Sequence, residues 1–68
     1  MTELVFDVRE APEGGFLAQA VGHDIFSEAD TVESLREQVR DAVHCHFDEE
    51  HLPSFIRLLF HREEVLAA

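Results

Sequence analysis

The feature that most constrains this chain is the helical period of residues 30–47. In this stretch the apolar and aromatic side chains recur at steps of three and four residues, which places one set on a single helix face: Val32, Leu35, Val39, Ala42, Val43, His46 and Phe47. Charged side chains fall on the opposite face. Asp30 is suited to be the N-cap, and Glu33 three residues later resembles the second half of a capping box. The pattern predicts an amphipathic helix that packs against another layer.

Four stretches around this helix have the alternation or composition of β-strands. They are residues 2–9, 16–21, 25–29 and 54–61. Pro12, Gly14 and Gly15 between the first two indicate a tight turn. The order β-β-β-α-β predicts a three-stranded meander and a helix that returns the chain to a fourth strand, parallel to the first. We therefore expect one α+β domain over residues 1–68. Its four-stranded mixed sheet would have the order 3-2-1-4, with one face covered by the helix.

The last predicted strand, residues 54–61, is apolar on both of its faces. Strands of this kind are typically buried on both sides, and we expect that here. Residues 62–68 are expected to form a short helical turn or a frayed end.

A single helix covers only one face of a four-stranded sheet. The predicted strands leave six apolar side chains on the uncovered face: Val5, Leu17, Val21, Phe26, Phe55 and Leu59. An apolar face of this size is typical of an interface. We expect these residues to contact either a second copy of the chain, in a homodimer, or another protein.

The charge balance limits the possible partners. Fifteen acidic residues stand against five arginines, with no lysine, which gives a net charge of −10. This charge opposes binding to nucleic acid and favours a basic protein partner, or serves solubility alone. Cys45 is the single cysteine, so no internal disulfide is expected, and a lone thiol suits a reducing cytoplasm. The sequence has no pattern of a signal peptide or a membrane span.

The sequence His44-Cys45-His46, with His51 nearby, has side chains that bind zinc. Adjacent helical residues point about 100° apart, so the first three cannot meet at one ion. His46 and His51 converge only if the chain turns after the helix. The alternatives are that His46 lies at the edge of the core, or that the histidines titrate at an interface. Cys45 lacks the oriented base that a nucleophile needs, and we expect no cofactor.

Strand order alone raises one enzymatic possibility. A β-β-β-α-β unit is the first part of the ribonuclease H-type fold, which cleaves nucleic acid with metal-binding carboxylates. Asp7 on the first strand, with Glu33 or Glu37 on the helix, could contribute such groups. The fourth strand contains no acidic residue, however, and Gly14-Gly15 joins two strands rather than a strand and a phosphate-binding helix. The sequence therefore favours this architecture without enzymatic activity.

Three short motifs resemble the HicB-like antitoxin family. They are Glu13-Gly14-Gly15-Phe16 at the turn into the second strand, the bridge Ser27-Glu28-Ala29-Asp30-Thr31, and the helix start Thr31-Val32-Glu33-Ser34-Leu35. With the strand order, the resemblance extends over about residues 3–61. Two features differ from the family pattern. Gly22-His23-Asp24 stands where family members often have Pro-Gly-Cys, and we expect the chain to lack the DNA-binding segment that many members carry.

The resemblance implies a partial ribonuclease H-like fold, self-association, and neutralisation of a small basic mRNA-cleaving toxin. It implies no catalytic residue in this chain. Without a DNA-binding segment, direct contact with nucleic acid is not expected. A solitary HicB-like protein with another role, or a small domain that binds a metal or ligand at residues 44–51, is the alternative.

Overall fold

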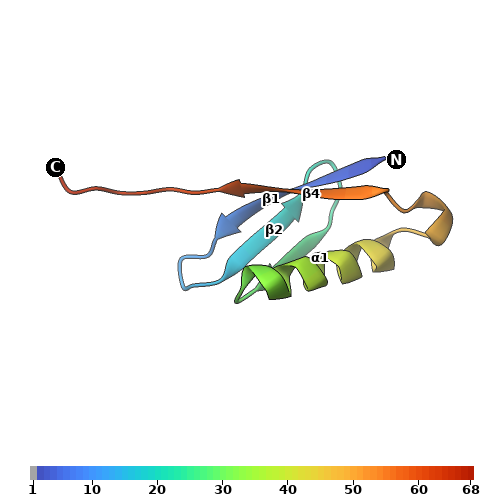
Figure 1. Ribbon diagram of the computed structural model, residues 1–68, viewed down its shortest axis with the longest axis horizontal. Coiled ribbons are helices and arrows are strands. Elements are labelled where there is room, and N and C mark those ends of the chain that lie inside the picture. The colour runs from blue at the N-terminus through green and yellow to red at the C-terminus, as the bar shows by residue number, and fades with distance from the viewer. Residues whose placement is uncertain (1) are drawn as a thin grey trace.

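The computed structural model describes residues 2–68 and confirms the predicted α+β topology, with one long helix packed on a four-stranded mixed sheet (Figure 1). Its elements, in chain order, are β1 (Glu3–Glu10), β2 (Phe16–Ala20), β3 (Phe26–Ala29), α1 (Val32–His46), the short 3-10 helix η1 (Glu49–His51) and β4 (Phe55–His61). The strand order in the sheet is β3-β2-β1-β4, as predicted.

Strand β1 organises the sheet because it pairs with two neighbours. It runs antiparallel to β2 and parallel to β4, so that Phe6 lies opposite both Ala20 and Leu58. Strand β3 pairs antiparallel with β2. The two edges of the sheet are therefore β3 and β4.

The core lies between the sheet and α1. Its nine buried apolar residues come from the sheet, the loop before β3, and the helix: Leu4, Phe6, Val8, Ala18, Ala20, Ile25, Leu35, Val39 and Val43. The small side chains of Ala18 and Ala20 let α1 lie close to β2, and the helix also packs on β3. The helix thus sits nearer the β3 edge of the sheet than the β4 edge.

The N-cap of the helix lies one residue later than predicted. Thr31, not Asp30, is the N-cap: its backbone is extended, and its hydroxyl accepts a hydrogen bond of 3.1 Å from the backbone N–H of Ser34. Both residue types cap helices well, and the sequence pattern alone does not distinguish neighbouring positions. The correction moves the helix start to Val32.

The turn between β1 and β2 makes a close contact with the segment that precedes the helix. The Gly14 N–H donates to the Ala11 carbonyl, and the Ala11 N–H donates to the Gly15 carbonyl. Gly15 has a φ of +80°, and a Cβ atom there would lie 2.8 Å from the carbonyl oxygen of Ala29. Glycine is therefore required at residue 15 for two reasons, its backbone conformation and the lack of space.

Strand β4 departs from the sequence prediction. It was expected to be buried on both faces, yet none of its residues is buried: Ile56 and Leu58 are half-buried, and the others are exposed. The reason is its place at the sheet edge, where α1 does not cover it. Residues 62–68 form no helical turn, and they continue beyond β4 as an extended chain (Figure 1). No helix in residues 2–68 has the length and apolar character needed to cross a bilayer.

The contact at Gly15 yields a stability prediction. We expect Gly15→Ala to lower the free energy of unfolding by about 3 kcal/mol, because strain at positive φ adds to the clash with Ala29. Gly22 has the same φ of +80° and open space around its Cα, so Gly22→Ala is the matched control. It should cost about 1 kcal/mol, from backbone strain alone. Urea denaturation measures the free energy of unfolding of both variants. Equal losses of stability in the two variants would contradict the predicted clash at residue 15.

The corrected cap yields a second prediction. Thr31→Ala removes the side-chain acceptor for the Ser34 N–H and should cost about 1 kcal/mol of stability. Asp30→Ala should cost only about 0.3 kcal/mol, through its weaker interaction with the helix dipole. Thermal unfolding of the two variants at equal concentration decides between the positions. A larger loss for Asp30→Ala would restore Asp30 as the cap.

Candidate interaction surface

Strand β4 exposes apolar side chains on both faces of an open sheet edge. Phe55 is 66% exposed and Leu59 42% exposed on the face away from the helix, and Phe60 is 51% exposed on the helix side. β1 occupies one edge of β4, and no strand of residues 2–68 pairs with the other. An open edge with apolar side chains is a template for pairing with another chain.

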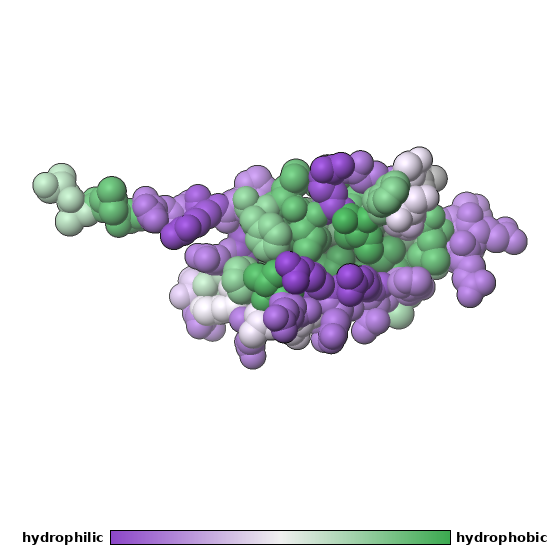
Figure 2. Space-filling view, viewed as in Figure 1, coloured by the Kyte–Doolittle hydropathy of each residue, from purple (hydrophilic) through white to green (hydrophobic). Residues whose placement is uncertain are grey.

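The helix side of β4 forms a groove against α1. We call it the α1–β4 groove. It has a volume of about 200 Å³, an apolar floor of Val39, Ile56 and Leu58, and two basic side chains, Arg36 and Arg40, on its helix wall. Figure 2 shows apolar surface running along the middle of the molecule above the helix, bordered by hydrophilic side chains. The groove therefore combines apolar surface with positive charge in a protein that is otherwise strongly acidic.

The six predicted interface residues all lie on the sheet face away from the helix, but they do not form one continuous surface. Val5 and Leu17 are half-buried, while Val21 and Phe26 are more than 50% exposed near the β3 edge. Phe55 and Leu59 lie at the β4 edge. The apolar residues thus form two groups, one toward each edge of the sheet.

Polar side chains fill the space between these two groups. In the row that contains Leu59 and Phe26, the residues between them are Asp7 and Gln19. The Asp7 carboxylate lies 2.9 Å from Nε2 of His61, which follows Leu59 on β4. A protein partner that covers the whole face would have to cover these polar groups as well.

An ion pair lies on the same face, four residues nearer the start of β1 and β4. The Arg57 guanidinium donates a hydrogen bond to the Glu3 carboxylate. This hydrogen bond and the positive charge of Arg57 lower the pKa of Glu3, and Glu3 in turn raises the pKa of Arg57. Both groups are solvent-accessible, so the pair contributes little to stability, but it fixes the charge pattern along β4.

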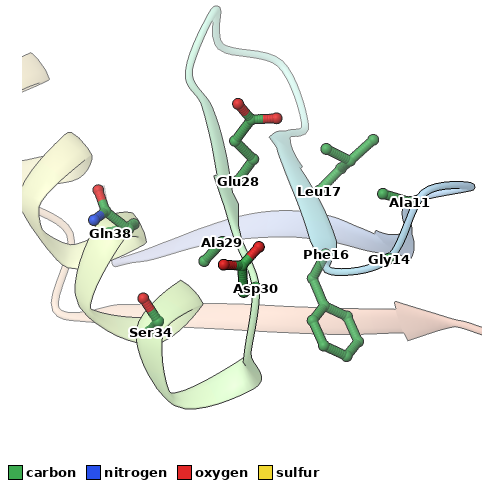
Figure 3. Close-up of a pocket in the computed structure, with 9 residues that line it drawn as sticks. All are labelled: Ala11, Gly14, Phe16, Leu17, Glu28, Ala29, Asp30, Ser34 and Gln38. Atoms are coloured by element: carbon green, nitrogen blue, oxygen red, sulfur yellow. The ribbon is translucent and has the colours of Figure 1, made fainter.

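An acidic hollow lies at the opposite edge of the sheet, where β2 and β3 meet the start of α1. Its volume is about 360 Å³, and its polar lining includes Glu28, Asp30, Ser34 and Gln38. Figure 3 shows that Glu28 points toward one side of the sheet, while Phe16 points toward the other. The hollow therefore presents negative charge at the β3 edge.

The histidines at the end of α1 do not assemble ligands around one point. His46 packs its ring against Phe47 at 4.9 Å and against His23 at 6.2 Å between ring centroids. Nδ1 of His51 lies 3.8 Å from the Asp48 carboxylate. Within residues 2–68, no three His, Cys, Asp or Glu side chains gather in a way that could hold a metal ion. His46 is exposed and reaches the core only through its contact with Phe47, which packs against it.

The carboxylates considered for a nuclease lie on different faces of the sheet. Asp7 points away from the helix and interacts with His61, whereas Glu33 and Glu37 are exposed on α1, which covers the other face. Metal-dependent cleavage of phosphodiesters requires carboxylates that converge on the metal ions. These three do not converge.

The features that the sequence analysis missed are the α1–β4 groove and the exposure of Phe60. The signal was present, because residues 54–61 are apolar on both faces. One predicted helix is too little to cover such a strand on both faces. The pattern was therefore equally compatible with a strand that its own chain leaves uncovered.

The chain is similar to two proteins that share a family name. It is 37% identical over 65 residues to a UPF0150 protein of Thermotoga maritima, and this alignment covers 96% of the chain and 91% of the relative. It is 46% identical over 50 residues to a UPF0150 protein of Archaeoglobus fulgidus, covering 74% of each. No family model matches the chain, and no solved structure gives a significant match.

Proposed function

The chain belongs to the UPF0150 protein family, and we propose that it is a non-enzymatic, HicB-like interaction domain. In this proposal it acts in the cytoplasm, associates with a second copy of itself, and neutralises a small basic mRNA-cleaving toxin. The exposed apolar edge at β4 is the observation that carries the self-association. The acidic surface supports the basic partner.

Self-association is supported by the surface that β4 leaves uncovered. Phe55, Leu59 and Phe60 are all more than 40% exposed on one edge strand. Burying such side chains contributes about 25 cal/mol for each Å² of apolar surface removed from water. A small domain with nine core residues gains proportionally more from this than a large one.

Binding of a basic partner is supported by the charge of the hollow at the β3 edge. Near β4, Arg57 and Arg62 are already paired with Glu3 and Glu64, while Arg36 and Arg40 line the α1–β4 groove. The hollow at the β3 edge instead has the carboxylates of Glu28 and Asp30 and no basic side chain in its lining. A basic partner is attracted to the β3 edge, which leaves β4 for the second copy.

The family motifs also have physical tasks in this fold. Gly15, in the Glu-Gly-Gly-Phe motif, allows the close approach to Ala29, and Thr31, in the helix-start motif, caps α1. Both residues bring the β1–β2 turn and the start of α1 together beside the acidic hollow. These tasks support the HicB resemblance because its motif residues build one part of the molecule.

The self-association predicts a concentration-dependent stability. We expect light scattering at micromolar concentration to give twice the mass of one chain, and the melting temperature to rise with protein concentration, because association stabilises only the folded state. If the mass stays at that of one chain and the melting temperature does not depend on concentration, the proposed self-association through β4 is wrong.

The partner proposal predicts where a basic protein binds. If the gene adjacent to that of this chain encodes a small basic protein, we expect that protein to bind with an on-rate that falls as salt is added. Glu28→Gln with Asp30→Asn should lower the on-rate by about tenfold. The double variant Glu49→Gln with Glu50→Gln removes the same charge from the distant helix η1 and is the matched control.

Three outcomes of this experiment are informative. A lower on-rate only for the β3-edge variant supports docking at the acidic hollow. Equal effects of the two double variants would show that only net charge attracts the partner, which refutes the docking site. No binding by the neighbouring protein, or no such neighbour, refutes the antitoxin role and leaves self-association to be judged by light scattering.

A further inference from the structure

Residues 62–68 extend beyond β4 as a largely exposed segment, in which Glu63 and Val65 border a hollow beside residues 9–12. They run on in line with β4, and the molecule measures 52 Å along its longest axis against 19 and 18 Å along the others (Figure 1). Val65 is 95% exposed and Leu66 is 81% exposed. Neighbouring apolar side chains on an extended segment are suited to pair with another strand.

We propose that residues 62–66 are a continuation of β4 that pairs with β4 of a second copy, antiparallel, with the two Phe60 side chains facing each other at the two-fold axis. This inference rests on the self-association proposed above and specifies its edge and its register. Each copy would contribute four strands to one continuous sheet, with both helices on the same side of it.

The register follows from the side chains on the face away from the helix. With Phe60 at the axis, residues whose numbers add up to 120 lie opposite each other. Arg57 of one copy, which also pairs with Glu3 of its own chain, then lies opposite Glu63 of the other, and Phe55 lies opposite Val65. Opposite charges and apolar side chains in directly opposed positions each stabilise an antiparallel pair, so this register satisfies both. The exposed Phe55 and Val65 cover each other.

The same register places charge correctly on the helix side. Glu64 of one copy lies opposite Ile56 of the other, and Ile56 lines the α1–β4 groove. The Glu64 carboxylate, which lies 3.1 Å from the Arg62 guanidinium of its own chain, therefore comes next to the groove that carries Arg36 and Arg40. The basic side chains of the groove, which have no ion-pair partner within residues 2–68, gain one from the second copy.

Shifted registers lose these interactions. With Leu58 at the axis, Glu63 would face Pro53, which has no N–H for the ladder, and the tail would run beside the acidic η1 helix. With Arg62 at the axis, two like charges would oppose each other. Intermediate shifts also separate Arg57 from Glu63 by two residues. The Phe60 register is the one that pairs the charges.

Single cysteines in the full chain test this register. In a Cys45→Ser background, Phe60→Cys places two thiols opposite each other, with Cβ atoms about 5 Å apart, within reach of a disulfide after a small adjustment. Leu58→Cys is the matched control on the same strand face. Its two copies would lie about 13 Å apart, too far for a disulfide. We expect mild oxidation to cross-link the Phe60→Cys chain and not the Leu58→Cys chain.

Shortened chains provide a second measurement. Ending the chain after His61 removes the residues opposite Phe55 to Leu58, and we expect the dissociation constant of the dimer to rise about tenfold or more. Ending it after Leu66 removes only Ala67 and Ala68, which lie beyond the paired residues, and should leave the constant unchanged. Circular dichroism verifies that both shortened chains keep their fold.

The outcomes separate this inference from the proposal on which it rests. Cross-linking at residue 60 alone, with weaker association of the chain that ends after His61, supports the register. Cross-linking at residue 58, or a dimer that neither cysteine cross-links or that does not depend on the tail, overturns the register and leaves self-association standing. A chain that stays monomeric at all concentrations overturns the self-association itself.

Discussion

The packing of α1 over β2 and β3 determines most of this structure. Ala18 and Ala20 are too small to hold the helix away from the sheet, so Leu35, Val39 and Val43 reach the core formed by β1. Because the helix lies toward the β3 edge, it covers that half of the sheet and leaves the β4 half open. The exposed apolar surface, the groove and the unpaired edge all follow from this placement.

Local sequence patterns sufficed to predict the four strands, the long helix and their order, but not the short helix η1. Alternation in β1 and the three-four spacing of α1 reflect which side chains face the core, and a single helix with a short meander allows few topologies. The position of β4 in the sheet was also predicted. The burial of β4 was not predicted correctly. An apolar pattern in the sequence is the same whether the side chains are covered by their own chain or by a partner.

The candidate surface was predictable only in part for a similar reason. Periodicity placed the predicted interface residues on the sheet face away from the helix, as the structure does: Val5, Leu17, Val21, Phe26, Phe55 and Leu59. It did not reveal that strand register would insert Asp7 and Gln19 between the two apolar groups, because register depends on pairing between distant segments. The proposed role of the β4 edge depends on the exposure of Phe60 and on the arginines of the α1–β4 groove, which come from segments distant in the sequence.

The close contact between Gly15 and Ala29 has a consequence for how this molecule opens. The β1–β2 turn and the end of β3 meet there at less than the normal spacing of side chains, directly before the Thr31 cap. The pairing of Phe16 with Ala29 and the Thr31 cap link these three parts to one another. Their amide protons should therefore exchange with solvent as one cooperative unit, apart from the fluctuations of the β4 edge.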